Sequence, residues 1–190
     1  MRIKPLLLAL ALSATVSGCA SLPRAQQYAE RPNDLGGLIY TATERMIEAA
    51  PSMAQNKPTI VATTVNIDDL NSSSTFGRLA SQLVSSRLSQ MGYLVMDVTY
   101  TQALELAPGT GEMVLSREAS RVAAERQAQA VVAGSYAVGG DQVYLNLRLL
   151  NAADGRLLSA TDVVLTLDEN TRRLVASGRN LPDRRAELGR

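Results

Sequence analysis

The residue best placed to do chemistry is Cys19, the only cysteine in this chain of 190 residues. It follows two cations, Arg2 and Lys4, a short apolar run over residues 6–12 and a stretch of small residues. This order is typical of a secretory signal peptide, and the apolar run is too short to span a bilayer. The pattern therefore predicts that residues 1–18 are a signal peptide and that the single thiol lies where cleavage falls.

The four residues from Val16 to Cys19, Val-Ser-Gly-Cys, resemble the lipobox of bacterial lipoproteins. The resemblance implies that the Cys19 sulfur takes a diacylglycerol, that the signal is cut before Cys19 and that the new amino terminus is acylated. One acyl chain holds a protein to a membrane only marginally, whereas two or more anchor it stably. Ala20 follows the cysteine in place of Asp, which by the same resemblance favours the outer membrane. The alternative is an ordinary secreted protein whose signal ends near a cysteine.

The composition argues against an enzyme, a metal site and a nucleic-acid partner. The chain has no His, so the commonest general base and metal ligand is absent. Beyond the predicted signal peptide the only lysine is Lys57, in a loop, which leaves no lysine to activate a serine. The formal charge of +1 gives no basic excess to hold a phosphate backbone. We therefore expect no catalytic residues, no cofactor and no bound metal.

The hydrophobic pattern predicts an α/β (α+β) fold with a single mixed sheet of about five strands. Helices are expected at 35–50, 75–91, 117–129 and 170–176, and strands at 59–65, 93–98, 130–138, 143–149 and 157–167. The order is β-α-β-α-β-β-β after an N-terminal helix, with the helices packed on the sheet. The helical crossover makes the first two strands parallel, and short turns make the last three an antiparallel meander. Residues 19–34 are expected to be a lipidated tether, 35–177 the domain and 178–190 a flexible tail.

The loop over residues 66–74 is the best candidate for a functional site. It follows a central strand and precedes a helix, where ligands usually bind in open α/β sheets. Asp68 and Asp69 could hold a cation, or the polar residues of the loop could satisfy turns and a helix cap. We take Asp68, Asp69, Asn71 and Arg78 as candidates for contact with a partner protein. Arg78 is expected to be exposed or paired with one of the two aspartates.

Three stretches together resemble the FlgO family of Gram-negative outer-membrane lipoproteins. They are residues 65–79, residues 111–118, and residues 130–136 followed by 143–150 and the Asp154–Gly155 turn. The resemblance implies an accessory protein that faces the periplasm, with members that support motility by helping to assemble flagellar ring structure. It implies no catalytic residue, and the family is wider than flagella.

Two functions from different classes follow from these observations. The first is a structural or assembly lipoprotein of the outer membrane, on its periplasmic face, that acts through protein–protein contacts. Its expected partners are the lipid bilayer through acylated Cys19, other envelope or flagellar proteins, and further copies of the same chain. The alternative is a periplasmic module tethered to the outer membrane that binds a small ligand or a cation at the 66–74 loop.

Overall fold

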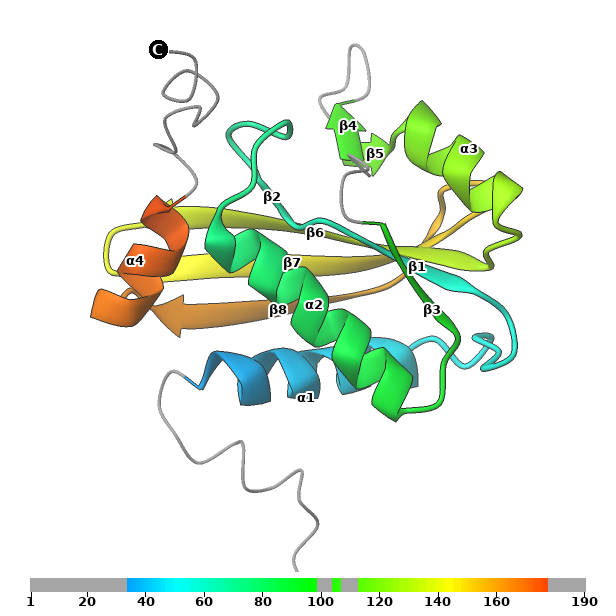
Figure 1. Cartoon of the computed structure of the whole chain (residues 1–190), viewed down its shortest axis with the longest axis horizontal. Coiled ribbons are helices and arrows are strands. Elements are labelled where there is room, and N and C mark those ends of the chain that lie inside the picture. Colours follow the sequence, from blue (N-terminus) through cyan, green and yellow to red (C-terminus); the bar gives the residue numbers. More distant parts are fainter. Residues whose placement is uncertain (1–33, 99–103, 107–112, 178–190) are drawn as a thin grey trace, which may run out of the picture.

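A computed structural model describes residues 34–98, 104–106 and 113–177 of the chain (Figure 1). Cys19, the remainder of the predicted tether up to residue 33, and the predicted tail 178–190 lie outside the described residues. The elements are α1 (Leu35–Glu48), β1 (Thr59–Ala62), β2 (Val65–Asn66), α2 (Thr75–Gln90), β3 (Val95–Val98), β4 (Leu104–Leu106), β5 (Met113–Leu115), α3 (Arg117–Glu125), β6 (Ala130–Gly139), β7 (Gln142–Asn151), β8 (Leu157–Thr166) and α4 (Glu169–Ala176).

The described strands form one large mixed sheet and one small one. The large sheet has the order β3-β1-β6-β7-β8, and β2 also pairs with β6. β1 runs parallel to both β3 and β6, and β6, β7 and β8 form an antiparallel meander. All four residues of β1 are buried, as expected for a strand with parallel neighbours and helices on both faces. The prediction of a mixed sheet with a parallel part and a meander is confirmed.

Three local predictions are wrong. The expected strand 59–65 divides into β1 and β2, because the Thr64 N–H donates to the Ser81 hydroxyl (2.7 Å) between the two strands. The expected connection around residues 104–115 contains β4 and β5, which pair antiparallel as a separate sheet. The third helix ends at Glu125 and not near residue 129, because Gln127 has a positive φ of 53° and the Ala128 N–H returns to the Ala123 carbonyl.

Helix ends follow the expected chemistry. The Ser74 hydroxyl accepts a hydrogen bond from the Gly77 N–H (3.3 Å) at the start of α2, and Ser116 caps α3 in the same way. Gly92 has a φ of 87° just after α2, a conformation in which a side chain is strained. Asp34 occupies the N-cap of α1, but its side chain makes no capping hydrogen bond.

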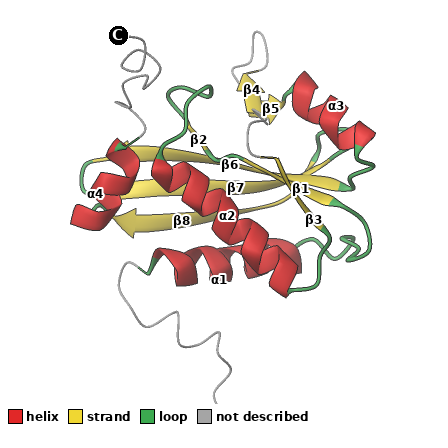
Figure 2. Ribbon diagram, in the orientation of Figure 1, coloured by secondary structure: helices red, strands yellow, loops and turns green. Residues whose placement is uncertain are grey.

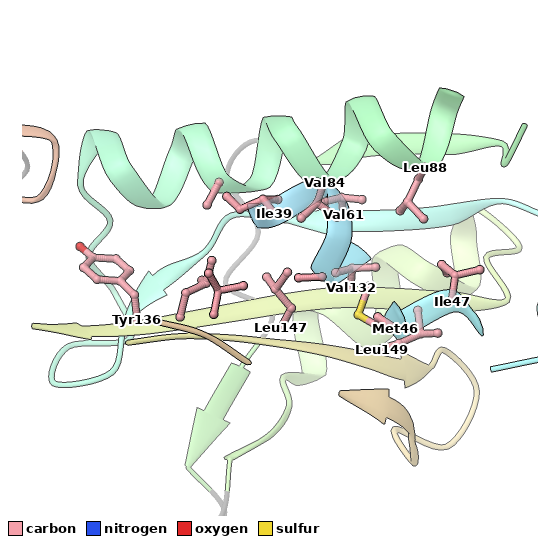
Figure 3. Packing of buried hydrophobic residues seen from close by; sticks show 14 of the residues in the cluster. Ile39, Met46, Ile47, Val61, Val84, Leu88, Val132, Tyr136, Leu147 and Leu149 are labelled. Carbon is pink, nitrogen blue, oxygen red and sulfur yellow. The ribbon is translucent and has the colours of Figure 1, made fainter. Parts of the chain in front are cut away.

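The helices divide between the two faces of the large sheet (Figures 1 and 2). α1, α2 and α4 cover one face, and Figure 3 shows side chains such as Ile39, Leu88 and Leu147 in the layer between helices and sheet. α3 and the β4–β5 pair cover the other face at one end only. There, a smaller cluster is formed by Ile60, Ala62, Leu104, Leu115, Ala119, Ala123, Val131, Ala133, Leu150 and Ala152. The far end of this second face lies beyond the cluster, beside the 66–74 loop.

Candidate functional site

The loop after β2 is a compact turn closed by its own backbone. The Asn66 N–H donates to the Ser72 carbonyl (3.0 Å), and the Ser72 N–H donates to the Asp69 carbonyl (2.9 Å). The Asp69 N–H in turn donates to the Asn66 carbonyl (3.2 Å). With the backbone groups satisfied internally, the side chains at the tip of the turn are left on the surface.

The turn brings three of the predicted contact residues together. Asp68, Asp69 and Asn71 are all exposed. The Asp69 carboxylate accepts the Asn71 N–H (3.1 Å), and the Asn66 side-chain oxygen accepts the Asp68 N–H (3.0 Å). Both are Asx turns, in which a short polar side chain holds the backbone two residues on. The Asp69 side chain therefore stabilises the turn, whereas the exposed Asp68 takes part in it through its backbone N–H.

Arg78 lies at the base of the same loop, on the first turn of α2. Its guanidinium donates to the Ser73 carbonyl (3.1 Å) and to the Thr75 hydroxyl (3.0 Å), and the residue is exposed. Among the described residues no ion pair joins Arg78 to Asp68 or Asp69. Arg78 was expected to be either exposed or paired with an aspartate, and in the structure it is exposed.

A set of hydroxyl groups, most of them buried, holds this loop to the sheet, and no pattern in the sequence predicted it. The Ser73 hydroxyl donates to the Thr64 carbonyl (2.7 Å), and the Ser81 hydroxyl lies 3.1 Å from the Thr64 hydroxyl. The Tyr136 hydroxyl accepts the Ser74 N–H (3.2 Å), while its ring meets Phe76 edge-on with centroids 5.3 Å apart. Phe76 is fully buried.

Two glycines allow close packing around Thr64, one on α2 and one on β6. A Cβ added at Gly77 would lie 2.3 Å from the Thr64 carbonyl oxygen, and one at Gly134 would lie 2.3 Å from the Thr64 hydroxyl. No Cβ fits at such distances, so both positions need glycine on grounds of space. At Gly77 the missing side chain lets the start of α2 come close to the sheet.

Beside the loop, the second face of the sheet is uncovered and carries a shallow pocket of about 170 Å³. Register places Ala137, Tyr144 and Val164 opposite one another on β6, β7 and β8, and Ile67 follows β2 at the same level. Ile67, Tyr144 and Val164 are 45%, 48% and 50% exposed. None of these residues was predicted to belong to a site, although Val164 is an apolar residue at an outward position of an alternating strand.

The described residues offer little for metal or membrane chemistry. Across residues 34–98, 104–106 and 113–177, no three His, Cys, Asp or Glu side chains gather as a metal site would require. In the same part of the chain no helix has the length and apolarity needed to cross a bilayer. What the site does present is an exposed polar turn on a rigid base, next to an uncovered sheet face.

The fold resembles solved bacterial proteins at low sequence identity. The C-terminal domain of LpoB from Salmonella enterica is 15% identical with a TM-score of 0.52, over 70% of this chain and 98% of that chain. The NMR structure of Escherichia coli LpoB is 15% identical with a TM-score of 0.45, over 87% of this chain and 84% of that one. Lipoprotein GNA1162 from Neisseria meningitidis is 14% identical with a TM-score of 0.39, over 70% and 89%. At such identities the likeness to the first of these indicates a shared fold alone.

Sequence comparison gives a more specific result. A search of curated proteins finds no matching sequence. The model of the FlgO family, described as FlgO protein, matches residues 40–170. This range contains most of α1, the whole large sheet and the loop that carries Asp68, Asp69, Asn71 and Arg78. Because the match spans well over half of the chain, the protein belongs to the FlgO family.

Proposed function

We propose that this protein is an outer-membrane lipoprotein that acts as an assembly accessory through protein–protein contacts made by its 66–78 region. Membership of the FlgO family and the lipobox that ends at Cys19 support this proposal. The observation that supports the proposal most directly is an exposed turn that presents Asp68, Asp69 and Asn71. This turn is held in place by a network of hydroxyl groups beneath it. A preorganised surface loses little conformational entropy when a partner binds, which favours recognition by a protein.

The test removes the charges of the region while it preserves the turn. In the triple variant Asp68→Asn, Asp69→Asn and Arg78→Gln, an amide oxygen at position 69 still accepts the Asn71 N–H. Envelope proteins are crosslinked in cells, purified with the lipoprotein and quantified by mass spectrometry. Removing a contact that contributes about 2 kcal/mol weakens binding by about thirtyfold, so we expect the crosslinked partner to be nearly lost.

The matched control neutralises an exposed charge pair on α3. Arg121→Gln with Glu125→Gln removes an i,i+4 pair whose side chains are 62% and 57% exposed, away from the loop. We expect this variant to retain the partner and both variants to unfold at the wild-type temperature. Equal recovery of every envelope protein by the triple variant and the wild type would refute the assignment of the contact region.

The cation-binding alternative gives a different result in the same set of proteins. A cation bound by Asp68 and Asp69 would raise the melting temperature of the wild type when Ca²⁺ or Mg²⁺ is added, because a ligand that binds only the folded state stabilises it. The triple variant would lose that rise. We expect no rise in either protein.

Lipid anchoring through Cys19 is a separate part of the proposal. We expect mass spectrometry of the native product to find a chain that begins at Cys19 and carries acyl groups. A Cys19→Ala variant should leave the membrane fraction, because the formal charge of +1 gives no polybasic attraction to lipid. An intact leader or an unmodified thiol at the mature start would overturn this part.

Flagellar ring assembly is the specific role that we propose within this general one. It rests on the family alone. A strain without the gene should swim less, and the triple variant should fail to restore motility although it is folded and membrane-bound. Normal motility of the deletion strain would restrict the proposal to a general role in the envelope.

A further inference from the structure

The uncovered part of the second sheet face has the properties of a binding site for a basic segment. We call it the open face and define it by Ile67, Ala137, Tyr144, Asn146, Asp162 and Val164, which line the pocket of about 170 Å³. α3 and the β4–β5 pair lie over the other end of this face (Figure 2).

The open face consists of two parallel rows. One is apolar, with Ile67, Tyr144 and Val164 each about half exposed. The next row is polar, where the Asn146 side-chain amide donates to the Asp162 carboxylate (2.8 Å). A Tyr ring, an apolar surface and a carboxylate lie side by side here, and together they are complementary to an arginine side chain. Its guanidinium pairs with carboxylates and lies on aromatic rings, while its aliphatic stem packs on apolar surface.

The pocket of the open face is lined by a single charge, which is negative. Asp162 is the only charged residue among those that line the pocket. Two further exposed acids adjoin strands of this face, since Asp68 follows Ile67 and Asp141 directly precedes β7. The nearest basic residue along β7 is Arg148, which lies opposite Ala133 and Ala160, one pair beyond the Asn146–Asp162 row.

The chain itself carries a segment with the complementary chemistry. Residues 178–190 follow α4 and contain four arginines and two leucines against only two acids. α4 ends close to the open face, because Val175 and Asn66 line one small pocket and Ile67, the next residue, lines the pocket of the open face. Thirteen extended residues span about 43 Å, which is ample for this path.

We propose that the arginine-bearing segment 178–190 binds the open face of its own chain, with a guanidinium at Asp162 and Tyr144. The covalent link places the segment at an effective concentration on the order of 1 mM, so even a contact of millimolar affinity fills the site about half of the time. A partner protein that uses the open face must then displace this segment.

The test measures how accessible Tyr144 is to solvent. Hydroxyl-radical footprinting with mass spectrometry compares the full wild-type chain with a full-length variant in which Arg179, Arg184, Arg185 and Arg190 are all replaced by Gln. Half occupancy at an effective concentration near the Kd predicts about twofold faster labelling of Tyr144 in the variant. The difference should disappear in 1 M salt, where the Debye length is about 3 Å.

Two controls make the result specific. Asp162→Asn keeps an oxygen for the Asn146 amide but removes the charge, so it should label Tyr144 as fast as the arginine variant. Tyr40, on α1 at the opposite face, should label at one rate in all proteins. Equal Tyr144 rates in the wild type and the arginine variant would overturn the proposal. Protection that grows with protein concentration would also overturn it, since the occupant would then be a second copy.

Discussion

Replacing Gly77 by Ala tests how tightly the candidate loop is held to the sheet. The added Cβ would lie 2.3 Å from the Thr64 carbonyl oxygen and 2.6 Å from the Ser73 hydroxyl. The first of these atoms belongs to the backbone and cannot rotate away. To reach an ordinary contact, the start of α2 must move outward by about 1 Å, which breaks the hydrogen bond from Ser73 to Thr64.

The expected loss of stability follows from these contacts. Overpacking of a tight site costs about 1–3 kcal/mol, and a lost buried hydrogen bond adds about 1 kcal/mol. The better helix propensity of Ala offsets up to about 1 kcal/mol. We therefore expect the free energy of unfolding to fall by about 2 kcal/mol, or roughly 7 °C in melting temperature for a domain of this size.

Gly36→Ala is the matched control. Gly36 is also in the first turn of a helix, but its added Cβ would meet only the Asp34 carboxylate at 3.4 Å, an ordinary contact. This variant should be unchanged or more stable by up to about 1 kcal/mol. Urea unfolding followed by circular dichroism measures both variants.

Gly134 allows a further check, because an added Cβ there would meet a side chain and not the backbone. The Cβ of Gly134→Ala would meet the Thr64 hydroxyl at 2.3 Å, so adding Thr64→Ala should recover part of the lost stability. The same second change should not recover Gly77→Ala, whose obstacle is the backbone. A Gly77→Ala protein as stable as the wild type would show that α2 is not tightly packed against Thr64.

Substitutions at three further positions test the packing around the loop and between α1 and α2, each by urea unfolding. Phe76→Ala should lower the free energy of unfolding by about 3–5 kcal/mol, because the fully buried ring leaves a cavity; Phe76→Leu should lower it less, and equal losses would contradict this. Ser74→Ala removes the cap of α2 and should cost about 1 kcal/mol, whereas Ser74→Asp should retain most of the stability. Glu44→Gln breaks the ion pair with Arg87 and should cost about 1 kcal/mol or less, a difference that 1 M salt should shrink.

The large elements were predictable because their signals are local. The alternation of apolar residues in β7 and the helical spacing in α2 each extend over ten or more residues. β4 and β5 have three residues each, too few to show a period, so only a connection was predicted there. The break between β1 and β2 was also missed, because it depends on Ser81, which is 17 positions away from Thr64.

The candidate site was predictable only in part, for the same reason. Turn residues act on neighbours, so the exposed Asp68, Asp69 and Asn71 could be placed on one loop from their order alone. The Tyr136 hydroxyl that receives the Ser74 N–H comes from 62 positions away, and no local pattern indicates that contact. The open face likewise depends on the register of β6, β7 and β8 and on where α3 stops covering the sheet.

The two sides of β6 imply an order in which the chain assembles. On one side, β6 meets β7 and then β8 through short turns, so these three strands can pair while the rest of the chain is still unfolded. On the other side, β1 reaches β6 through the pairing of Val61 with Val132, about seventy positions apart, and must close a long loop first. We therefore expect the C-terminal meander to form first and β1, β3 and α2 to pack against it. The contacts of Thr64 with Ser73 and Ser81 should be among the last to form.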